Sequence, residues 1–192
     1  MLDKTIPYVD VIMRRKKETP VPCIKLPDGF IFSHFIDGDE KAWAEIEASV
    51  LEFPNISDAL IYFQKEYKPF ISELERRCVF IETADGEKIA TATAWWRYTG
   101  YRRDPWLNWV SVKPQYQGNG LGRAIISETM HLMVKIEGDR DFYLHTQTWS
   151  HKAIRIYESM GFYITNEKNL GNYANDNYEW AIEILRKKNH GK

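Results

Sequence analysis

The sequence predicts a mixed α/β fold in a single domain that spans residues 1–192. Short runs rich in β-branched and aromatic residues alternate with stretches whose apolar residues recur every three or four positions. The chain has 192 residues, which is enough for one domain with a substantial core and marginal for two. We therefore expect one twisted sheet with helices packed on its faces.

The first half of the chain begins with residues 1–27, which we interpret as an N-terminal extension because Pro20, Pro22 and Pro27 interrupt it. Strands are expected where β-branched and aromatic residues cluster, at residues 7–13, 29–36, 78–83 and 89–96. An Asp-Gly dipeptide typical of tight hairpin turns joins the last two strands. Between residues 36 and 78 we expect two helices, one capped by Asp37 or Asp39 and the other by Ser57.

The second half begins with aromatic residues interleaved with arginines between residues 95 and 109. We expect this stretch to form a turn that leads into a central strand. After the strand, an apolar face of helical period predicts a helix that ends at Gly138. The remaining expected elements are strands at residues 142–148, 162–165 and 178–185, and a helix at 151–160.

The composition gives no overall electrostatic case for a nucleic acid or an anionic membrane as a partner. Lys and Arg number 26 and Asp and Glu number 27, so the net charge is -1. Cys23 and Cys78 belong to no Cys-x-x-Cys pair or Cys/His cluster, so neither a disulfide framework nor a metal site is expected. The chain shows no secretion signal and no apolar run of membrane-spanning length, so the expected location is the cytoplasm.

The segment from Val110 to Ile126 has the pattern of a strand, a glycine-rich loop and a helix. Gly118, Gly120 and Gly122 alternate with larger residues just before the helical pattern starts. The first backbone N–H groups of such a helix are unpaired and lie at the positive end of the helix dipole, and glycines let a ligand approach the main chain. The junction is therefore predicted to bind an anionic group.

Three kinds of phosphate-binding loop share this pattern. A P-loop needs Lys and then Ser or Thr after its last glycine, whereas Gly122 is followed by Arg123 and Ala124. The dinucleotide fingerprint needs a glycine where Arg123 stands, and also a surrounding βαβ unit. The third kind of loop has the pattern Gln-Gly-x-Gly-x-Gly after a Val-x-Val strand, and this pattern fits the segment.

A second motif lies between Ser150 and Phe162. Together the two segments resemble the GNAT N-acetyltransferase superfamily, whose members bind acetyl-CoA. The second motif matches the family pattern at Ala153, Tyr157, Gly161 and Phe162. The resemblance covers residues 78–185 and implies the GNAT fold, a twisted mixed β-sheet with central splayed strands flanked by helices. It also implies an acetyl-CoA-dependent N-acyltransferase that moves an acetyl group to a primary amine.

The resemblance further implies which residues bind the cofactor. Backbone groups of the central strand would bind the pantetheine arm and polarise the thioester, and N–H groups of the loop would bind the pyrophosphate, with Arg123 adding charge. Ser150 replaces a family asparagine that contacts the pantetheine arm, and we expect it to keep one hydrogen bond and to cap the next helix. The expected cofactor-binding residues are Val110, Ser111, Val112, Gln117, Gly118, Asn119, Gly120, Leu121, Gly122, Arg123 and Ser150.

Tyr157 and His145 are the expected catalytic residues. The family places a phenol at the position of Tyr157 beside the sulfur, and a phenol with a reference pKa of about 10 is protonated at neutral pH and can donate to a leaving thiolate. His145 stands where related ribosomal-protein N-terminal acetyltransferases carry a glutamate base. Neutral imidazole at this position can accept the ammonium proton directly or through a water. The alternative for both side chains is a packing role.

We expect the acceptor to be a small-molecule amine, and two other functions remain open: a protein or peptide acetyltransferase, and a non-catalytic acyl-CoA-binding module. The aromatic stretch with Arg97, Arg102 and Arg103 can form ordinary core, or wall a substrate pocket in which a guanidinium binds a carboxylate. Nucleic-acid binding through that stretch is disfavoured by the balanced charge. Homodimers are common in the family, and no residue pattern here identifies an interface.

Overall fold

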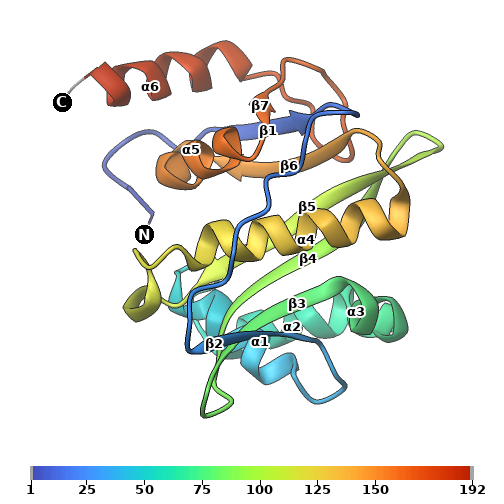
Figure 1. Ribbon diagram of the computed structural model, residues 1–192. Helices are drawn as coiled ribbons and strands as arrows, with labels where there is room; N and C mark the ends of the chain where they lie inside the picture. Colours follow the sequence, from blue (N-terminus) through green and yellow to red (C-terminus); the bar gives the residue numbers. More distant parts are fainter. Residues whose placement is uncertain (1, 191–192) are drawn as a thin grey trace.

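The computed structural model describes residues 2–190, which form a mixed sheet with helices on both faces (Figure 1). The seven strands found in these residues lie in the order β2-β3-β4-β5-β6-β1-β7. They are β1 (Asp10–Arg15), β2 (Phe30–His34), β3 (Cys78–Thr83), β4 (Lys88–Thr99), β5 (Arg102–Val112), β6 (Phe142–Gln147) and β7 (Tyr163–Ile164). The expected mixed α/β fold is confirmed.

The helices alternate with the strands along the chain. They are α1 (Glu40–Ser49), α2 (Ile56–Glu66), α3 (Ile71–Arg77), α4 (Leu121–Glu137), α5 (His151–Ser159) and α6 (Tyr178–His190). Short 3-10 helices lie at Lys68–Phe70, Pro114–Tyr116 and Thr148–Ser150. Within residues 2–190, no helix is long and apolar enough to cross a lipid bilayer.

The two faces of the sheet bury separate apolar clusters. Along β3, Val79 and Ile81 belong to the cluster that includes α4, whereas Cys78 and Phe80 belong to the cluster that includes α1 and α2. This division follows from the alternation of side chains along a strand. The sheet therefore carries α4 on one face and α1 and α2 on the other (Figure 1).

The centre of the sheet is splayed. Every neighbouring pair of strands is antiparallel except β5 and β6, which are parallel and meet at a single register pair, Trp106 opposite Tyr143. Beyond Trp106 the two strands diverge, while β5 continues to pair with β4 as far as Val112. The edge of β5 that faces β6 is therefore left without a strand partner at Val110–Val112.

The stretch between residues 95 and 109 is not the predicted turn. It forms the far end of β4 and most of β5, and the reversal between these strands occupies only Gly100 and Tyr101. A bulge interrupts the pairing of β4 with β5, and within it Trp109 adopts a positive φ of 51°. Bulges bend a strand and redirect its side chains. Aromatic residues are common in strands as well as in irregular loops, and this is why the stretch was wrongly predicted to be a turn.

Three predicted helix caps differ from the structure. Helix α2 is capped by Asn55, whose Oδ1 accepts a hydrogen bond from the Asp58 N–H at 2.9 Å, and not by Ser57. Asp39 precedes α1 and Ser150 precedes α5, as expected, but neither side chain makes a capping hydrogen bond. The residue types that cap helices are also frequent in turns. The sequence therefore identifies the region in which a helix starts more reliably than the exact capping residue.

The predicted strand at residues 178–185 is wrong, because this segment begins helix α6. Its buried residues Ala181, Ile184 and Leu185 are spaced three and four apart, which matches one face of a helix. Strand β1, from the presumed extension, lies inside the sheet between β6 and β7. The chain therefore completes its sheet with an N-terminal strand, and α6 packs beside it (Figure 1).

Candidate active site

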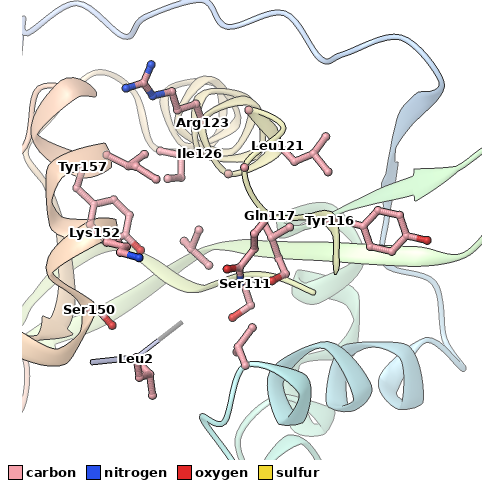
Figure 2. A pocket seen from close by; sticks show the side chains of 18 of the residues that line it. Leu2, Ser111, Tyr116, Gln117, Leu121, Arg123, Ile126, Ser150, Lys152 and Tyr157 are labelled. Atoms are coloured by element: carbon pink, nitrogen blue, oxygen red, sulfur yellow. Dashed lines mark hydrogen bonds between the residues drawn. The ribbon is translucent and has the colours of Figure 1, made fainter. Parts of the chain in front are cut away.

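A cavity of about 510 Å³ opens where β5 leaves its partner β6. Its walls come from the end of β5, the glycine-rich loop, the first turn of α4 and one side of α5. Figure 2 shows Tyr157 and Lys152 of α5 on one side of this cavity and Gln117 of the loop on the other. All of the predicted cofactor-binding residues line the cavity except Asn119.

The glycine-rich loop keeps its main chain open to the cavity. Gly118 and Gly120 have φ values of +87° and +82°, and the space that a β-carbon would occupy at each is empty. L-residues rarely adopt this conformation, so glycine is required for the path of the loop. The side chains of Gln117 and Asn119 stabilise the loop by donating hydrogen bonds to the carbonyl groups of Val112 (2.8 Å) and Tyr116 (3.3 Å).

A second cavity of about 660 Å³ meets the first one at Tyr157. The residues that line both are Leu2, Glu52, Val110, Ser111, Ser150, Ala153 and Tyr157. Aromatic side chains supply much of the remaining wall, namely Tyr8, Tyr62, Trp109, Trp149 and Tyr173. We call these spaces the cofactor cavity and the acceptor cavity, and the residues shared by both the junction.

Tyr157 occupies the junction as a buried residue, with 7% of its surface exposed. Burial raises the pKa of its phenol above the ordinary value, and the nearby carboxyl groups of Glu52 and Glu47 raise it further. The hydroxyl group therefore remains protonated throughout the neutral range. Such a group can donate a proton or a hydrogen bond to an atom bound between the cavities.

His145 lines the acceptor cavity from β6. Its Nε2 lies 2.8 Å from Oδ1 of Asp10 on β1, and its ring stacks on Tyr173 with the centroids 4.1 Å apart. Burial lowers the pKa of the imidazole, and the hydrogen bond to Asp10 opposes that shift. His145 is therefore neutral at pH 7, as its predicted role as a base requires.

Glu47 is a functional candidate that the sequence analysis missed. It lies on α1, is fully buried and lines the acceptor cavity. Its Oε2 accepts a hydrogen bond from the Ser111 hydroxyl at 2.9 Å, whereas its Oε1 has no hydrogen-bond partner among the described residues. Burial raises the pKa of this carboxyl group to about 8, Ser111 opposes the shift and Glu52 adds to it.

A signal for Glu47 was present in the sequence. Trp43 and Ile46 mark the apolar face of α1, and Glu47 falls on the same face, one helical turn after Trp43. A carboxylate on the buried face of a helix is unusual unless it is paired or functional. This pattern could have identified Glu47 without a structure.

The three arginines of the aromatic stretch have different surroundings. Arg102 pairs with Asp104 and Arg103 pairs with Glu137. Arg97 lines the acceptor cavity, where its guanidinium lies over the rings of Trp106 and Tyr173 at 5.6 Å and 5.2 Å from their centroids. Neither Arg102 nor Arg103 lines this cavity.

A family model described as the acetyltransferase (GNAT) family matches residues 41–162. The chain belongs to the GNAT acetyltransferase family. This match confirms the resemblance inferred from the two motifs, and it includes the glycine-rich loop, His145 and Tyr157. Acetyl transfer from acetyl-CoA is general for the GNAT family, and the open loop and adjoining cavity of this chain fit that cofactor.

Solved GNAT structures share this fold. A GCN5-related N-acetyltransferase from Sphaerobacter thermophilus has a TM-score of 0.62 and 22% identity over 83% of this chain and 49% of its own. A GNAT acetyltransferase from Colwellia psychrerythraea has a TM-score of 0.61 and 13% identity, over 85% and 55% of the two chains. A tandem GNAT protein from the clavulanic acid biosynthesis pathway has a TM-score of 0.59 and 16% identity, over 85% and 52%.

The comparisons identify the fold and the family but not the substrate. This chain spans about half the length of the solved structures described above. No curated protein sequence matches it. One fold supports many acceptors, so the acceptor must be inferred from the chemistry of the second cavity.

Proposed function

We propose that this protein transfers the acetyl group of acetyl-CoA to the primary amine of a small molecule. The observation that carries the proposal is the acceptor cavity, which meets the cofactor cavity at Tyr157 and is walled by aromatic side chains from several elements. A cavity of about 660 Å³ has the size of a small-molecule site, whereas a peptide acetyltransferase needs an open groove.

Bound acetyl-CoA supplies an activated thioester, and the residues of this chain position the reactants and move protons. The glycine-rich loop and Arg123 hold the anionic part of the cofactor. The unpaired edge of β5 at Val110–Val112 offers backbone groups to the pantetheine arm, although the Val112 carbonyl already accepts a hydrogen bond from Gln117. The amine nitrogen attacks the thioester carbonyl, and Tyr157 donates a proton to the departing sulfur.

The acceptor reaches the cavity as an ammonium ion and must lose a proton before it attacks. In this proposal His145 accepts that proton directly or through a water, as the sequence analysis predicts. We propose Glu47 as a second base, and its burial and its hydrogen bond to Ser111 at the junction support this role. The two bases titrate in different pH ranges, so a pH profile separates them.

The proposal is tested by assaying CoA release and N-acetyl product formation over a panel of small primary amines and peptides. Thermal unfolding with acetyl-CoA, with ADP as the control, measures cofactor binding separately. A ligand at about one hundred times its dissociation constant adds roughly 2.7 kcal/mol of stability. We expect stabilisation by acetyl-CoA and turnover of small amines.

Two results would contradict the proposal. Preferential turnover of peptides would assign the protein to the protein and peptide acetyltransferases. Stabilisation by acetyl-CoA without turnover of any amine would indicate an acyl-CoA-binding module.

A further inference from the structure

The charge of Arg97 is not neutralised within the described part of the chain. Its cross-strand neighbour Asp104 pairs with Arg102 instead, and Arg97 forms no ion pair and no hydrogen bond with any of residues 2–190. Its Nε is buried without a partner. A half-buried cation without a counter-ion is less stable than a paired one, so this site is suited to an anion supplied by a ligand.

The surrounding structure holds Arg97 in place. The guanidinium lies over the rings of Trp106 and Tyr173, whose centroids are 5.7 Å apart within one cluster. A β-carbon at Gly171 would lie 3.2 Å from Cδ of Arg97, so the backbone of the loop at residues 166–177 closes against the arginine stem. The Gly171 N–H donates a hydrogen bond to Oγ1 of Thr99 at 2.9 Å, which ties this loop to β4. Arg97 is therefore a preorganised anion-binding group.

The acceptor cavity is polar in a defined direction. Tyr157 and Glu52 lie at the junction with the cofactor cavity, and Glu47 is bonded to Ser111 of the same junction. Arg97 and Tyr173 line the acceptor cavity but not the cofactor cavity. The carboxyl groups of Glu52 and Glu47 thus lie at or beside the place where an amine must react, whereas Arg97 lies outside the junction in a cavity that Glu66 also lines.

We propose that the acceptor is an amine that also carries a carboxylate or phosphate group, and that Arg97 binds this anion while the amine lies at the junction near Glu47 and Tyr157. This inference rests on the proposed function, since it identifies the class of acceptor for that reaction. Guanidinium groups bind carboxylate and phosphate through paired N–H donors, so both anions suit the site.

The first experiment compares amines that differ in the anion alone. The pairs are phenylalanine with phenethylamine, lysine with cadaverine, and glucosamine 6-phosphate with glucosamine. We expect the anionic member of at least one pair to have a kcat/KM at least tenfold higher, and the pair that shows this distinguishes a carboxylate from a phosphate. Equal or higher kcat/KM for the member without the anion in every pair would overturn the inference.

Variants then test whether Arg97 causes the preference. Arg97→Gln should lower kcat/KM for the anionic member about 10- to 100-fold and change it less than about twofold for the member without the anion, consistent with the loss of a charge-assisted hydrogen bond. Arg97→Lys, which keeps the charge, should have an intermediate effect. Arg103→Gln is the matched control, because Arg103 belongs to the same hairpin, does not line the acceptor cavity and pairs with Glu137 and not with Asp104. An equal loss for both members would overturn the role of Arg97.

Equilibrium binding separates this inference from the proposed function. Binding of each amine to the wild-type protein and to Arg97→Gln is measured by calorimetry in the presence of CoA, which cannot react. Arg97-dependent binding of the anionic amine without turnover would refute the acetyltransferase proposal and retain the anion site. Turnover that does not depend on the anion would refute the anion site and retain the acetyltransferase proposal. The absence of both binding and turnover would refute both proposals.

Discussion

The hydroxyl group of Ser111 donates a hydrogen bond to Oε2 of Glu47 at 2.9 Å, and this contact joins the splayed strand β5 to helix α1. Both residues are buried, and Ser111 lines the cofactor and acceptor cavities. A carboxyl group is thus held beside the reaction centre with one oxygen satisfied and the other without a partner in the described chain. Such an arrangement is unfavourable for the empty protein and useful for binding a cation.

Replacing Glu47 with glutamine should stabilise the protein at neutral and alkaline pH. The folded-state pKa of about 8 exceeds the ordinary value of 4.5, so the unfolded state loses its proton first and folding stability falls as pH rises from 4.5 to 8. At roughly 1.4 kcal/mol per pKa unit, the Glu47→Gln change should recover a few kcal/mol above pH 8. Urea unfolding at pH 5 and pH 8 measures the difference. Glu45→Gln on the same helix is the control, and equal pH dependence in wild type and Glu47→Gln would contradict the assignment.

Replacing Tyr157 with phenylalanine should lower the rate of acetyl transfer by about two orders of magnitude, at the lower end of the usual range for a general acid. The ring keeps its packing against Phe162, so the protein should fold and bind acetyl-CoA as before. Single-turnover kinetics at saturating acetyl-CoA measures the chemical step, and thermal unfolding with acetyl-CoA is the control for binding. An unchanged rate would remove Tyr157 from the mechanism.

The pH profile of kcat/KM should identify the base. Burial lowers the pKa of His145, so a reaction that depends on neutral His145 should lose activity only below pH 6.5. His145→Ala should remove this acidic limb. Asp10→Asn should shift the limb to lower pH, because the Asp10 hydrogen bond raises the pKa of His145. A limb near pH 8 that disappears in Glu47→Gln would assign the base to Glu47 instead.

Replacing Gly171 with alanine should weaken both the fold and the acceptor site. Gly171 has a φ of +57°, and a β-carbon there would lie 3.1 Å from the Trp106 ring and 3.2 Å from Arg97. We expect a loss of about 1 kcal/mol or more in unfolding free energy and a higher KM for an anionic acceptor. Gly100→Ala is the matched control, because Gly100 has a φ of +59° with open space around it. Equal effects of both changes on KM would show that the contact with Arg97 is unimportant.

The sequence predicted the family, and the residues that it assigned to cofactor binding line one cavity apart from Asn119, because both features depend on local backbone chemistry. Glycines at 118 and 120 allow positive φ values, and the strand and helix on either side are encoded in adjacent residues. Ser150 and Tyr157 follow from the same kind of local motif. The confirmed parts of the prediction are the mixed α/β fold and the GNAT family, whereas the catalytic roles remain to be tested.

The acceptor cavity could not be predicted because its residues come together only in the folded chain. The partner of His145 is Asp10 on a strand that the sequence analysis assigned to an extension, and Glu47 reaches Ser111 from α1. The error at residues 178–185 has a related cause, since isoleucine and aromatic residues suit both a strand and the buried face of a helix. Tertiary packing decided between the two.

Strand β1 lies between β6 and β7, so it pairs with two strands that are synthesised long after it. Until β6 and β7 are made, β1 lacks both of its strand partners, and the nascent chain carries an unpaired strand that is prone to wrong pairing. Contacts so distant in sequence also slow folding. Because β1 carries the Asp10 that contacts His145, the acceptor cavity acquires its histidine pair only when this last pairing closes the sheet.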